Sequence, residues 1–315
     1  MITSIGPNNW KWHQYNKNEI EKIKHVIHKE YCPFNKEWLD NVQENKTNCL
    51  RTVLLENEKK IVKGSLVYDQ NFDDELEHKI CHFYITNDQL ITVDLELSSL
   101  QHMSQELLFQ QIDKTENAVD GFLIILGELM NEMLYGIDQF EEKLNKLIWN
   151  VSKKNKTSIL DKIYIQRHEL LIWKNLIIPM KELKMAIEEI YLDDINTGNI
   201  FKRTCKKIDR AMALITEYET EIDSMINLEE VISSHRGNEI MKTLTVITTI
   251  FTPVMALGAL WGMNFKHMPE LEWKYGYLFS VLLIVISTLA LYGYLKMKGW
   301  TGDLLEGRKK GSFFE

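Results

Sequence analysis

Near its C-terminus the chain reads Trp261-Gly262-Met263-Asn264-Phe265-Lys266-His267-Met268-Pro269-Glu270-Leu271-Glu272-Trp273-Lys274-Tyr275-Gly276-Tyr277. The polar part of this segment connects two uncharged stretches, Thr243–Trp261 and Gly276–Leu295, of 19 and 20 residues. A helix of either length extends for about 30 Å at about 1.5 Å per residue, which matches the hydrocarbon core of a bilayer. The pair therefore predicts two transmembrane helices joined by residues 262–275, and a buried helical hairpin is the alternative.

The distribution of charge predicts the side of the membrane on which each part lies. The tail at 296–315 carries five lysine and arginine residues, whereas the connection has two lysines balanced by two glutamates. An excess of lysine and arginine marks the cytoplasmic side. The N-terminus has no basic segment followed by an apolar run, so we predict no signal peptide. We therefore expect a protein of the cell membrane with both termini in the cytoplasm and the connection outside.

The averages of the whole chain conceal this membrane part. Its 315 residues have a net charge of −8 and a mean hydropathy of −0.23, as in an ordinary soluble protein. Residues 237–315 carry 8 basic and 6 acidic residues, which leaves 29 and 39 for residues 1–236, a net charge of −10. The acidic balance argues against a nucleic-acid partner. The sequence has neither a nucleotide-binding loop nor a Ser-His-Asp arrangement, so we predict no enzyme activity and no cofactor.

The part that precedes the membrane helices is expected to be an α+β cytosolic domain followed by long helices. Four runs in residues 1–115 are rich in branched and aromatic side chains and predict strands, with a turn at Asn87-Asp88: Cys49–Leu55, Ile61–Tyr68, Ile80–Thr86 and Gln89–Leu95. Residues 116–199 are expected to form a hairpin of two helices, 118–150 and 158–192. Pro179 should kink or break the second helix.

Residues 200–261 predict one helix of about 90 Å, a stalk that continues into the first membrane span at 243–261. One face of this helix carries mostly small, polar or thioether side chains in heptad order: Ser224, Asn227, Val231, Ser234, Asn238, Met241, Thr245, Thr248, Thr252, Met255 and Ala259. Such a face can pack against other membrane helices. It can also line a water-filled pore, which needs several copies of the chain around an axis. The face alone favours neither interpretation.

The connection resembles the signature of CorA-type magnesium transport proteins, the Gly-Met-Asn metal ion transporter family. The resemblance rests on the triplet Gly262-Met263-Asn264, on Met268-Pro269-Glu270-Leu271, and on the aromatic-Lys-aromatic-Gly-Tyr pattern at 273–277. It extends upstream through 238–245 and 251–253. The family implies a funnel-shaped homopentamer with five first-span helices around a pore and the second spans outside them. It also implies import of Mg²⁺, and of Co²⁺ or Ni²⁺, down the electrochemical gradient.

The resemblance further implies roles for individual residues. Gly262, Met263 and Asn264 would form the outer mouth, where five Asn264 amide oxygens hydrogen-bond the water shell of a hydrated Mg²⁺. Glu270 and Glu272 would form acidic rings that concentrate cations. A helix C-cap is the alternative role for Asn264, and a solvated loop charge is the alternative for Glu270. The implied pore-lining residues, of which Met241 and Leu244 would be the hydrophobic gate, are Asn238, Met241, Leu244, Thr245, Thr248, Thr252, Met255 and Ala259.

The sequence departs from the family pattern at three places. Thr252 and Ala259 stand where well-known members have methionine and glycine. Residues 200–207 replace the family's Tyr-Phe-Arg-Asp-Val-Tyr-Asp-His, so Arg203 and Lys206 occupy the acidic positions thought to bind regulatory magnesium. We therefore expect no direct transfer of that site, and hypothesise that Arg203 or Lys206 pairs with an acidic residue of a neighbouring subunit. Acidic pairs at 188–189 and 193–194 are candidate sensing surfaces.

Three functions are compatible with these observations. The first is the CorA-type channel for Mg²⁺, also passing Co²⁺ or Ni²⁺. The second is a zinc transporter of the same fold, and the third is a two-span receptor that does not conduct ions. The expected partners are further copies of the chain, membrane lipid and the transported ion, with Mg²⁺ as a candidate regulatory ligand. A receptor gives no reason for a polar face within a membrane helix.

Overall fold

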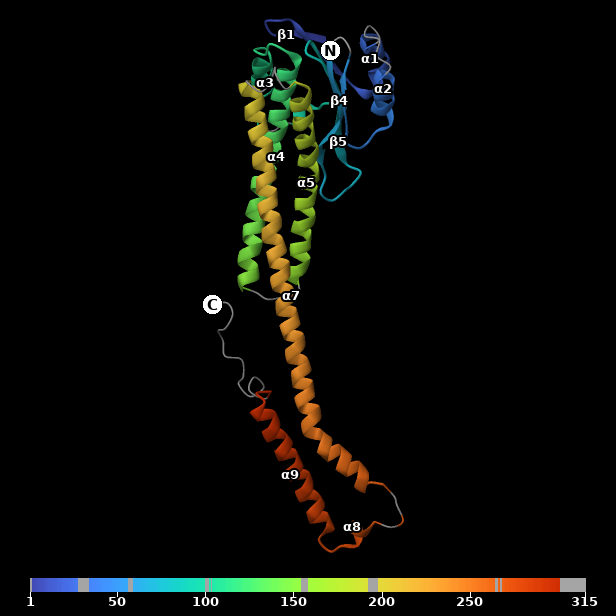
Figure 1. Ribbon diagram of the computed structural model, residues 1–315, viewed down its shortest axis with the longest axis vertical. Helices are drawn as coiled ribbons and strands as arrows, with labels where there is room; N and C mark the ends of the chain where they lie inside the picture. The colour runs from blue at the N-terminus through green and yellow to red at the C-terminus, as the bar shows by residue number, and fades with distance from the viewer. Residues whose placement is uncertain are drawn as a thin grey trace. The chain divides into compact units, whose positions relative to one another are not determined.

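The computed structural model describes residues 2–27, 34–55, 59–99, 102, 104–153, 158–191, 198–263, 266 and 268–300 (Figure 1). The chain divides into two compact units, Met1–Ser224 and Met225–Glu315. The first unit contains a β-sheet and packed helices, and the second contains helices alone in its described part.

The first unit is built on a six-stranded sheet in the order β1-β2-β6-β5-β4-β3. The strands are β1 Ile2–Ile5, β2 Trp10–Tyr15, β3 Cys49–Leu54, β4 Lys60–Gln70, β5 His78–Ile85 and β6 Gln89–Val93. Only β2 and β6 pair in parallel; the other neighbours are antiparallel. The four predicted strands are confirmed as β3 to β6, and Thr86 N donates to Gln89 O (2.8 Å) across the predicted turn.

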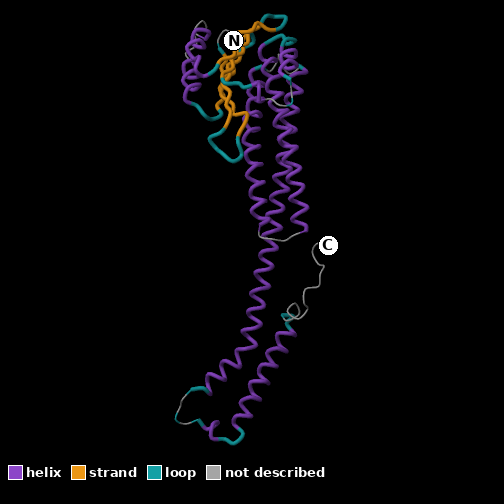
Figure 2. Tube along the Cα trace, turned by 180° about the vertical axis from the view of Figure 1, so that it is seen from behind, coloured by secondary structure: helices purple, strands orange, loops and turns teal. Residues whose placement is uncertain are grey.

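Helices cover both faces of this sheet (Figure 2). On one face, α1 (Ile20–Ile27) and α2 (Phe34–Glu44) bury Ile23, Trp38 and Val42 in a core with strand residues such as Tyr84. On the other face lie α4 (Ala118–Lys153) and α5 (Ser158–Ile190), and the Phe122 ring lies 5.2 Å from the Phe83 ring. Short helical turns at Lys17–Glu19 and Leu97–Ser99 and helix α3 (Gln105–Ile112) connect these elements.

Helix α7 (Asn199–Trp261) runs without interruption from the first unit into the second. Its first part packs against α5 through ion pairs, which join Lys174 to Glu219 at 2.7 Å and Lys184 to Asp209 at 2.8 Å. Its Tyr218 ring lies 5.9 Å from the Phe140 ring of α4. The first unit therefore contains three long helices held by buried apolar contacts and by surface ion pairs.

Helix α5 continues through Pro179, so of the two expected effects the break is wrong, and the kink stays a prediction. Proline removes the hydrogen bond to the carbonyl of Asn175, which is an exposed residue, so water can satisfy that oxygen. Ile177 and Met180 beside the proline are fully buried. Packing on the buried side therefore holds the helix together where one backbone hydrogen bond is lost.

The second unit consists of the remainder of α7, helix α8 (Pro269–Glu272) and helix α9 (Gly276–Met297). Helix α9 ends in a Schellman motif: Gly299 has φ +73°, its N–H donates to Lys296 O, and Trp300 N–H donates to Leu295 O. Helices α7 and α9 are long and apolar enough to cross a membrane, and only 6% of the apolar segment of each helix is buried.

Candidate functional site

The residues implied to line a pore lie in the second unit, on the latter part of α7. They are exposed apart from Thr245, which is half-buried: Asn238, Met241, Leu244, Thr245, Thr248, Thr252, Met255 and Ala259. On a different side of the same stretch, Val246 and Pro253 are buried. Apolar residues on other sides of the helix, such as Ile247 and Phe251, are exposed as well, and this strip is distinguished by the polar and thioether side chains that follow one another along it. We call this exposed strip the polar seam.

Three threonines give the polar seam a defined hydrogen-bonding character. Each hydroxyl donates to a carbonyl one turn back: Thr245 Oγ1 to Met241 O (2.8 Å), Thr248 Oγ1 to Leu244 O (2.9 Å) and Thr252 Oγ1 to Thr248 O (2.7 Å). A hydroxyl has one hydrogen and two lone pairs, so only acceptor capacity remains for other molecules. Water in the shell of a cation points its hydrogens outward. The seam therefore presents acceptors that suit a hydrated cation.

Two large apolar side chains stand before the threonines in the seam. Met241 is 61% exposed and Leu244 is 54% exposed, and they stand three residues apart on one helix face. Asn238 is exposed one turn before Met241. A ring of such methionine and leucine side chains can exclude water when it narrows, which stops ion passage without any charged group.

Helix α7 bends within the second unit, in its orange lower part (Figure 1). Pro253 lies inside this part of the helix and lacks an N–H, so the carbonyl of Thr249 has no backbone donor one turn on. Proline is the usual cause of a sharp bend in a helix. Met255 and Ala259 follow Pro253, so their part of the seam takes a different direction from the part at Asn238.

The implied mouth begins where α7 ends. Gly262 N–H donates to Gly258 O (2.9 Å), Met263 N–H is 3.4 Å from Leu260 O, and both residues are exposed. A Cβ at Gly262 would lie 3.0 Å from Gly258 O, so a larger residue would crowd the last turn. Asn264, the central residue of the sequence-based prediction, lies outside the described residues, and so does the side chain of Glu270. Glu272 is exposed at the end of α8.

Aromatic side chains hold the connection against the start of α9. The Trp273 ring lies 5.7 Å from the Phe279 ring and 6.5 Å from the Tyr275 ring. Gly276 N–H donates to Trp273 O (2.8 Å), which fixes the first turn of the helix. Tryptophan and tyrosine prefer the boundary between lipid and water. This cluster thus provides an anchor between the mouth and the second membrane helix.

The stretch that departs from the family pattern lies at the start of α7, in the first unit. Arg203 and Lys206 are exposed, and their pairing with a neighbouring subunit stays a prediction. In the same stretch, Thr204 Oγ1 donates to Leu123 O (3.0 Å), and Lys207 Nζ donates to Gly127 O (2.9 Å). The sequence reasoning missed these two contacts with α4.

Gly127, in the middle of a long predicted helix, was the feature of the sequence that could have indicated these two contacts. A Cβ at Gly127 would lie 3.1 Å from Thr204 Oγ1, so the glycine permits the close approach of α7 to α4. Of the candidate sensing surfaces, Glu188 and Glu189 are exposed, while the pair at 193–194 lies outside the described residues. Within the described ranges, no group of three His, Cys, Asp or Glu side chains is placed to hold a metal ion.

Comparisons with known proteins give the family of the chain. A family model described as CorA-like Mg²⁺ transporter protein matches residues 55–297. The magnesium transport protein CorA of Bacillus subtilis (strain 168) is 48% identical over 301 residues, which cover 96% of this chain and 94% of that protein.

Two solved structures share the fold. The CorA magnesium transporter of Methanocaldococcus jannaschii has a TM-score of 0.63 at 18% identity, covering 95% of this chain and 94% of that one. The full-length CmaX protein has a TM-score of 0.65 at 15% identity, covering 93% and 90%. The family model spans most of the sequence, and a near-full-length relative shares almost half of its residues. The chain therefore belongs to the family of CorA-like Mg²⁺ transporter proteins.

Proposed function

We propose that the chain forms a channel that carries Mg²⁺ into the cell down its electrochemical gradient. The observation that carries the proposal is the polar seam of α7. Thr245, Thr248 and Thr252 already donate their hydroxyl hydrogens within the helix, so they offer only acceptors. A membrane helix that faced lipid on all sides would gain nothing from such a strip, whereas a helix beside a column of hydrated cations would.

The pore is formed by a homopentamer. Two membrane helices cannot enclose a water-filled path, so identical seams must meet around a symmetry axis. Five copies of α7 place their seams inward, and five copies of α9, which is apolar on all sides, face the lipid. The funnel-shaped cytosolic part and both chain ends then lie in the cytoplasm, and residues 262–275 lie outside.

Selection takes place at the mouth, where hydrated Mg²⁺ meets five Asn264 amide oxygens and the Gly262 carbonyls. Magnesium dehydrates reluctantly and prefers octahedral oxygen coordination, so contact through its water shell avoids the cost of stripping that shell. Glu270 and Glu272 raise the local concentration of cations. Met241 and Leu244 form the gate, which closes by excluding water.

The membrane potential supplies the driving force. A single charge gains about 2.3 kcal/mol per 100 mV, so a divalent ion gains about 4.6 kcal/mol on moving inward. No ATP-dependent step is needed. The same geometry accepts Co²⁺ and Ni²⁺, which have hydrated forms of similar size. Magnesium is favoured over zinc as the cargo because both the family description and the Bacillus subtilis relative name magnesium.

Ion flux into liposomes that contain the purified protein tests the proposal. Asn264→Ala should lower Mg²⁺ flux at least tenfold, because five amides are lost and each neutral hydrogen bond contributes about 0.5–1.5 kcal/mol. Asn175→Ala, at an exposed position of α5, is the matched control and should leave flux unchanged. Unchanged selective Mg²⁺ uptake by Asn264→Ala would contradict the selection mechanism.

The same liposomes separate the alternative functions. A zinc transporter would move Zn²⁺ in preference to Mg²⁺ and would respond to an imposed proton gradient, whereas a channel driven by potential alone would not. A receptor without conduction would show no flux of any divalent ion above that of empty liposomes. Mg²⁺ uptake that follows the membrane potential supports the channel.

A further inference from the structure

The start of α7 carries an exposed group of cations in the first unit, at Arg203, Lys206 and Arg210. They stand three and four residues apart, so they share one side of the helix. All three are exposed, and none forms an ion pair with another described residue of the chain. Residues 1–236 have a net charge of −10, so these cations stand out on an acidic domain. We call the three side chains the basic face.

Helix α2 carries an exposed acidic group in the same unit. Asp40 and Glu44 stand four residues apart, so they lie on one side of this helix. Both are exposed, and neither has an ion-pair partner in the ranges that the structure describes. We call these two side chains the acidic face. Its charge is complementary to that of the basic face.

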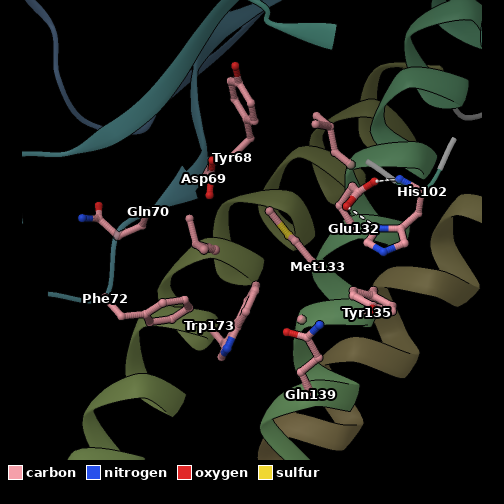
Figure 3. A pocket seen from close by; sticks show the side chains of 13 residues that line it. Tyr68, Asp69, Gln70, Phe72, His102, Glu132, Met133, Tyr135, Gln139 and Trp173 are labelled. Atoms are coloured by element: carbon pink, nitrogen blue, oxygen red, sulfur yellow. Dashed lines mark hydrogen bonds and ion pairs between the residues drawn. The ribbon is translucent and has the colours of Figure 1, made fainter. Parts of the chain in front are cut away.

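Other carboxylates of the first unit are already engaged within their own copy of the chain. Glu132 lines a cavity of about 430 Å³ between the end of β4 and helices α4 and α5, and it lies 2.8 Å from His102 Nδ1 (Figure 3). Asp209 of α7 lies 2.8 Å from Lys184 Nζ. The acidic face differs from these carboxylates because its charges remain available to another molecule.

A line of contacts through the first unit relates the positions of the two faces. It begins at Thr204, which lies next to the basic face in the sequence. Thr204 Oγ1 donates to Leu123 O of α4 (3.0 Å). The neighbouring Phe122 ring lies 5.2 Å from the Phe83 ring of β5. The line thus passes from α7 through α4 to one face of the sheet.

The line continues through the sheet to α2. Phe83 is paired with Gly64 of β4, and Gly64 O accepts a hydrogen bond from Trp38 Nε1 (3.4 Å). Trp38 stands two residues before Asp40 on α2. Figure 1 shows α2 and the yellow start of α7 at the same end of the first unit, with the sheet and the α4–α5 pair between them. The two faces therefore lie at one level, on opposite sides of the unit.

We propose that the basic face of one copy docks on the acidic face of the next copy. This contact rests on the homopentamer of the proposed function. Complementary faces on opposite sides of one body give a head-to-tail contact, and such a contact closes into a ring when its rotation allows. Two faces at the same level favour a ring over a filament, because each copy then adds no shift along the axis.

The contact can be weak and still form. The membrane helices already hold the copies together, so each face meets its partner at an effective concentration on the order of millimolar. A few ion pairs at exposed positions are then sufficient, and salt should weaken them. The charges of the chain itself close this contact, so it needs no bound divalent cation between the copies.

Carbodiimide coupling of the full-length protein in detergent tests the contact, because this reagent joins a lysine amine to a carboxylate only where the two groups touch. At low ionic strength, a denaturing gel should show covalent oligomers up to the pentamer. Mass spectrometry should find Lys206 joined to Asp40 or Glu44. The yield should fall about fivefold in 1 M salt, where charges are screened beyond about 3 Å. Absence of this link, or coupling of Lys206 to other carboxylates only, would overturn the proposal.

Paired substitutions assign the link to the acidic face. Asp40→Asn with Glu44→Gln should lower the yield of oligomers about fivefold or more, since both ion pairs are lost. Asp73→Asn with Glu75→Gln also removes two exposed charges, from the β4–β5 loop, and should leave the yield unchanged. Equal yields in the parent and in the variant of the acidic face would overturn the proposal.

Charge reversal gives a test that misfolding cannot imitate. Asp40→Lys with Glu44→Lys should abolish the link, because like charges then face each other. Adding Arg203→Glu and Lys206→Glu to the same chain should restore at least half of the yield, with amine and carboxylate exchanged between the faces. A combined variant that couples no better than the first one would overturn the proposal.

Ion flux into liposomes separates this contact from the proposed function. Coupling through the two faces in a protein that carries no Mg²⁺ would contradict the channel and support the contact. Mg²⁺ flux in a protein whose two faces do not couple would support the channel and overturn the contact. A ladder of oligomers that ends at the dimer would overturn the ring.

Discussion

The two units of the chain differ in how many of their apolar side chains are buried. In the first unit, large side chains such as Trp12, Phe83 and Phe140 are almost fully buried. The one polar side-chain atom of these three, Trp12 Nε1, donates to Thr92 Oγ1 at 3.1 Å. Beyond Ser224, the described part of the chain buries only four hydrophobic side chains: Met225, Ile226, Val246 and Leu295.

Because of this difference, the two units need different surroundings. A sheet with helices on both faces removes its own apolar surface from water. Two helices cannot do so, and their backbone hydrogen bonds are satisfied internally, which is the condition for a segment placed in lipid. The second unit therefore needs apolar surroundings that its own described residues do not supply, and a given change should act differently in the two units.

The largest expected effect is that of a leucine-to-lysine substitution on membrane insertion, compared at an exposed leucine in each unit. Leu289 of α9 is 62% exposed, and Leu76 of the β4–β5 loop is 83% exposed. Leu289→Lys should cost about 3 kcal/mol of membrane insertion, because lysine near the centre of a membrane helix is unfavourable by about 2.5–3.5 kcal/mol. Leu76→Lys should change stability by less than about 0.5 kcal/mol. Membrane fractionation of the two variants measures the effect, and equal insertion would show that α9 does not face lipid.

Acidification should lower the stability of the first unit. Burial, helped by the nearby Lys17 charge, lowers the pKa of His82 to about 4, and burial also lowers the pKa of His13. An unfolded histidine titrates near 6.5, so the unfolded chain binds more protons between pH 6.5 and 4. The free energy of unfolding should be at its full value above pH 6.5. It should fall as the pH drops toward 4, by roughly 3 kcal/mol for His82 alone.

Urea unfolding of the full chain in detergent, followed over this pH range, measures that slope. His82→Gln should flatten it, although the variant loses the contact of 2.7 Å between His82 Nδ1 and Ser65 Oγ and so starts from a lower stability. His235→Gln, at an exposed position of the second unit, should leave the slope as it is. An unchanged slope in His82→Gln would rule out this histidine as the cause.

Adding one methyl group at a glycine should have opposite signs in the two units. A Cβ at Gly121 would lie 2.5 Å from Trp10 Cη2, so Gly121→Ala should destabilise the first unit by about 1–3 kcal/mol through overpacking. At Gly237 nothing lies within 4 Å. Gly237→Ala should therefore stabilise α7 by about 0.5–1 kcal/mol, because glycine is a poor helix former. Unfolding midpoints compare the two, and two shifts of the same sign would contradict the difference in packing.

The sequence predicted the elements that have a regular local pattern and missed those that depend on distant residues. Strands β3 to β6 show runs of branched and aromatic residues, so a local pattern was enough. Strand β2 was missed because its buried side chains, Trp10, Trp12 and His13, alternate poorly and include a histidine. Its partner β6 lies about 80 residues away, and no local pattern reports a parallel pairing at that distance. A break at Pro179 was one of two expected effects, and it does not occur because the packing of buried neighbours such as Met180 outweighs the local preference.

In the candidate site, the sequence predicted the residues that share one helix face but not the features that depend on side-chain orientation or on the fold. The polar seam was visible in the sequence because heptad spacing fixes which residues share a helix face. The acceptor-only state of its threonines was not visible, since it depends on hydroxyl orientation toward carbonyls such as Met241 O. A cavity of the first unit beside the end of β4 was missed completely. Its walls come from residues 68–72, 102, 129–139 and 173–176, which only the fold brings together.

The smallest expected effect concerns Arg203 and Lys206, where an exposed part of the first unit is predicted to meet another copy. An acidic pair at this place would attract Mg²⁺, whereas two cations repel it, so bound Mg²⁺ should give this chain little protection against proteolysis in its cytosolic part. Changing both residues to aspartate should create that protection. It should also remove ion pairs across the subunit boundary, each worth about 0–1 kcal/mol at an exposed position.

Limited proteolysis of the full-length protein in detergent, with and without Mg²⁺, compares the two forms. Lys202→Asp, at an exposed position on the same turn of α7, is the control for added negative charge alone. Strong Mg²⁺ protection of the unchanged chain would mean that carboxylates elsewhere in the chain bind the ion. Exposed surfaces of the first unit would then sense magnesium without the residues that the family pattern uses, and the exposed Glu188 and Glu189 would be the next residues to change.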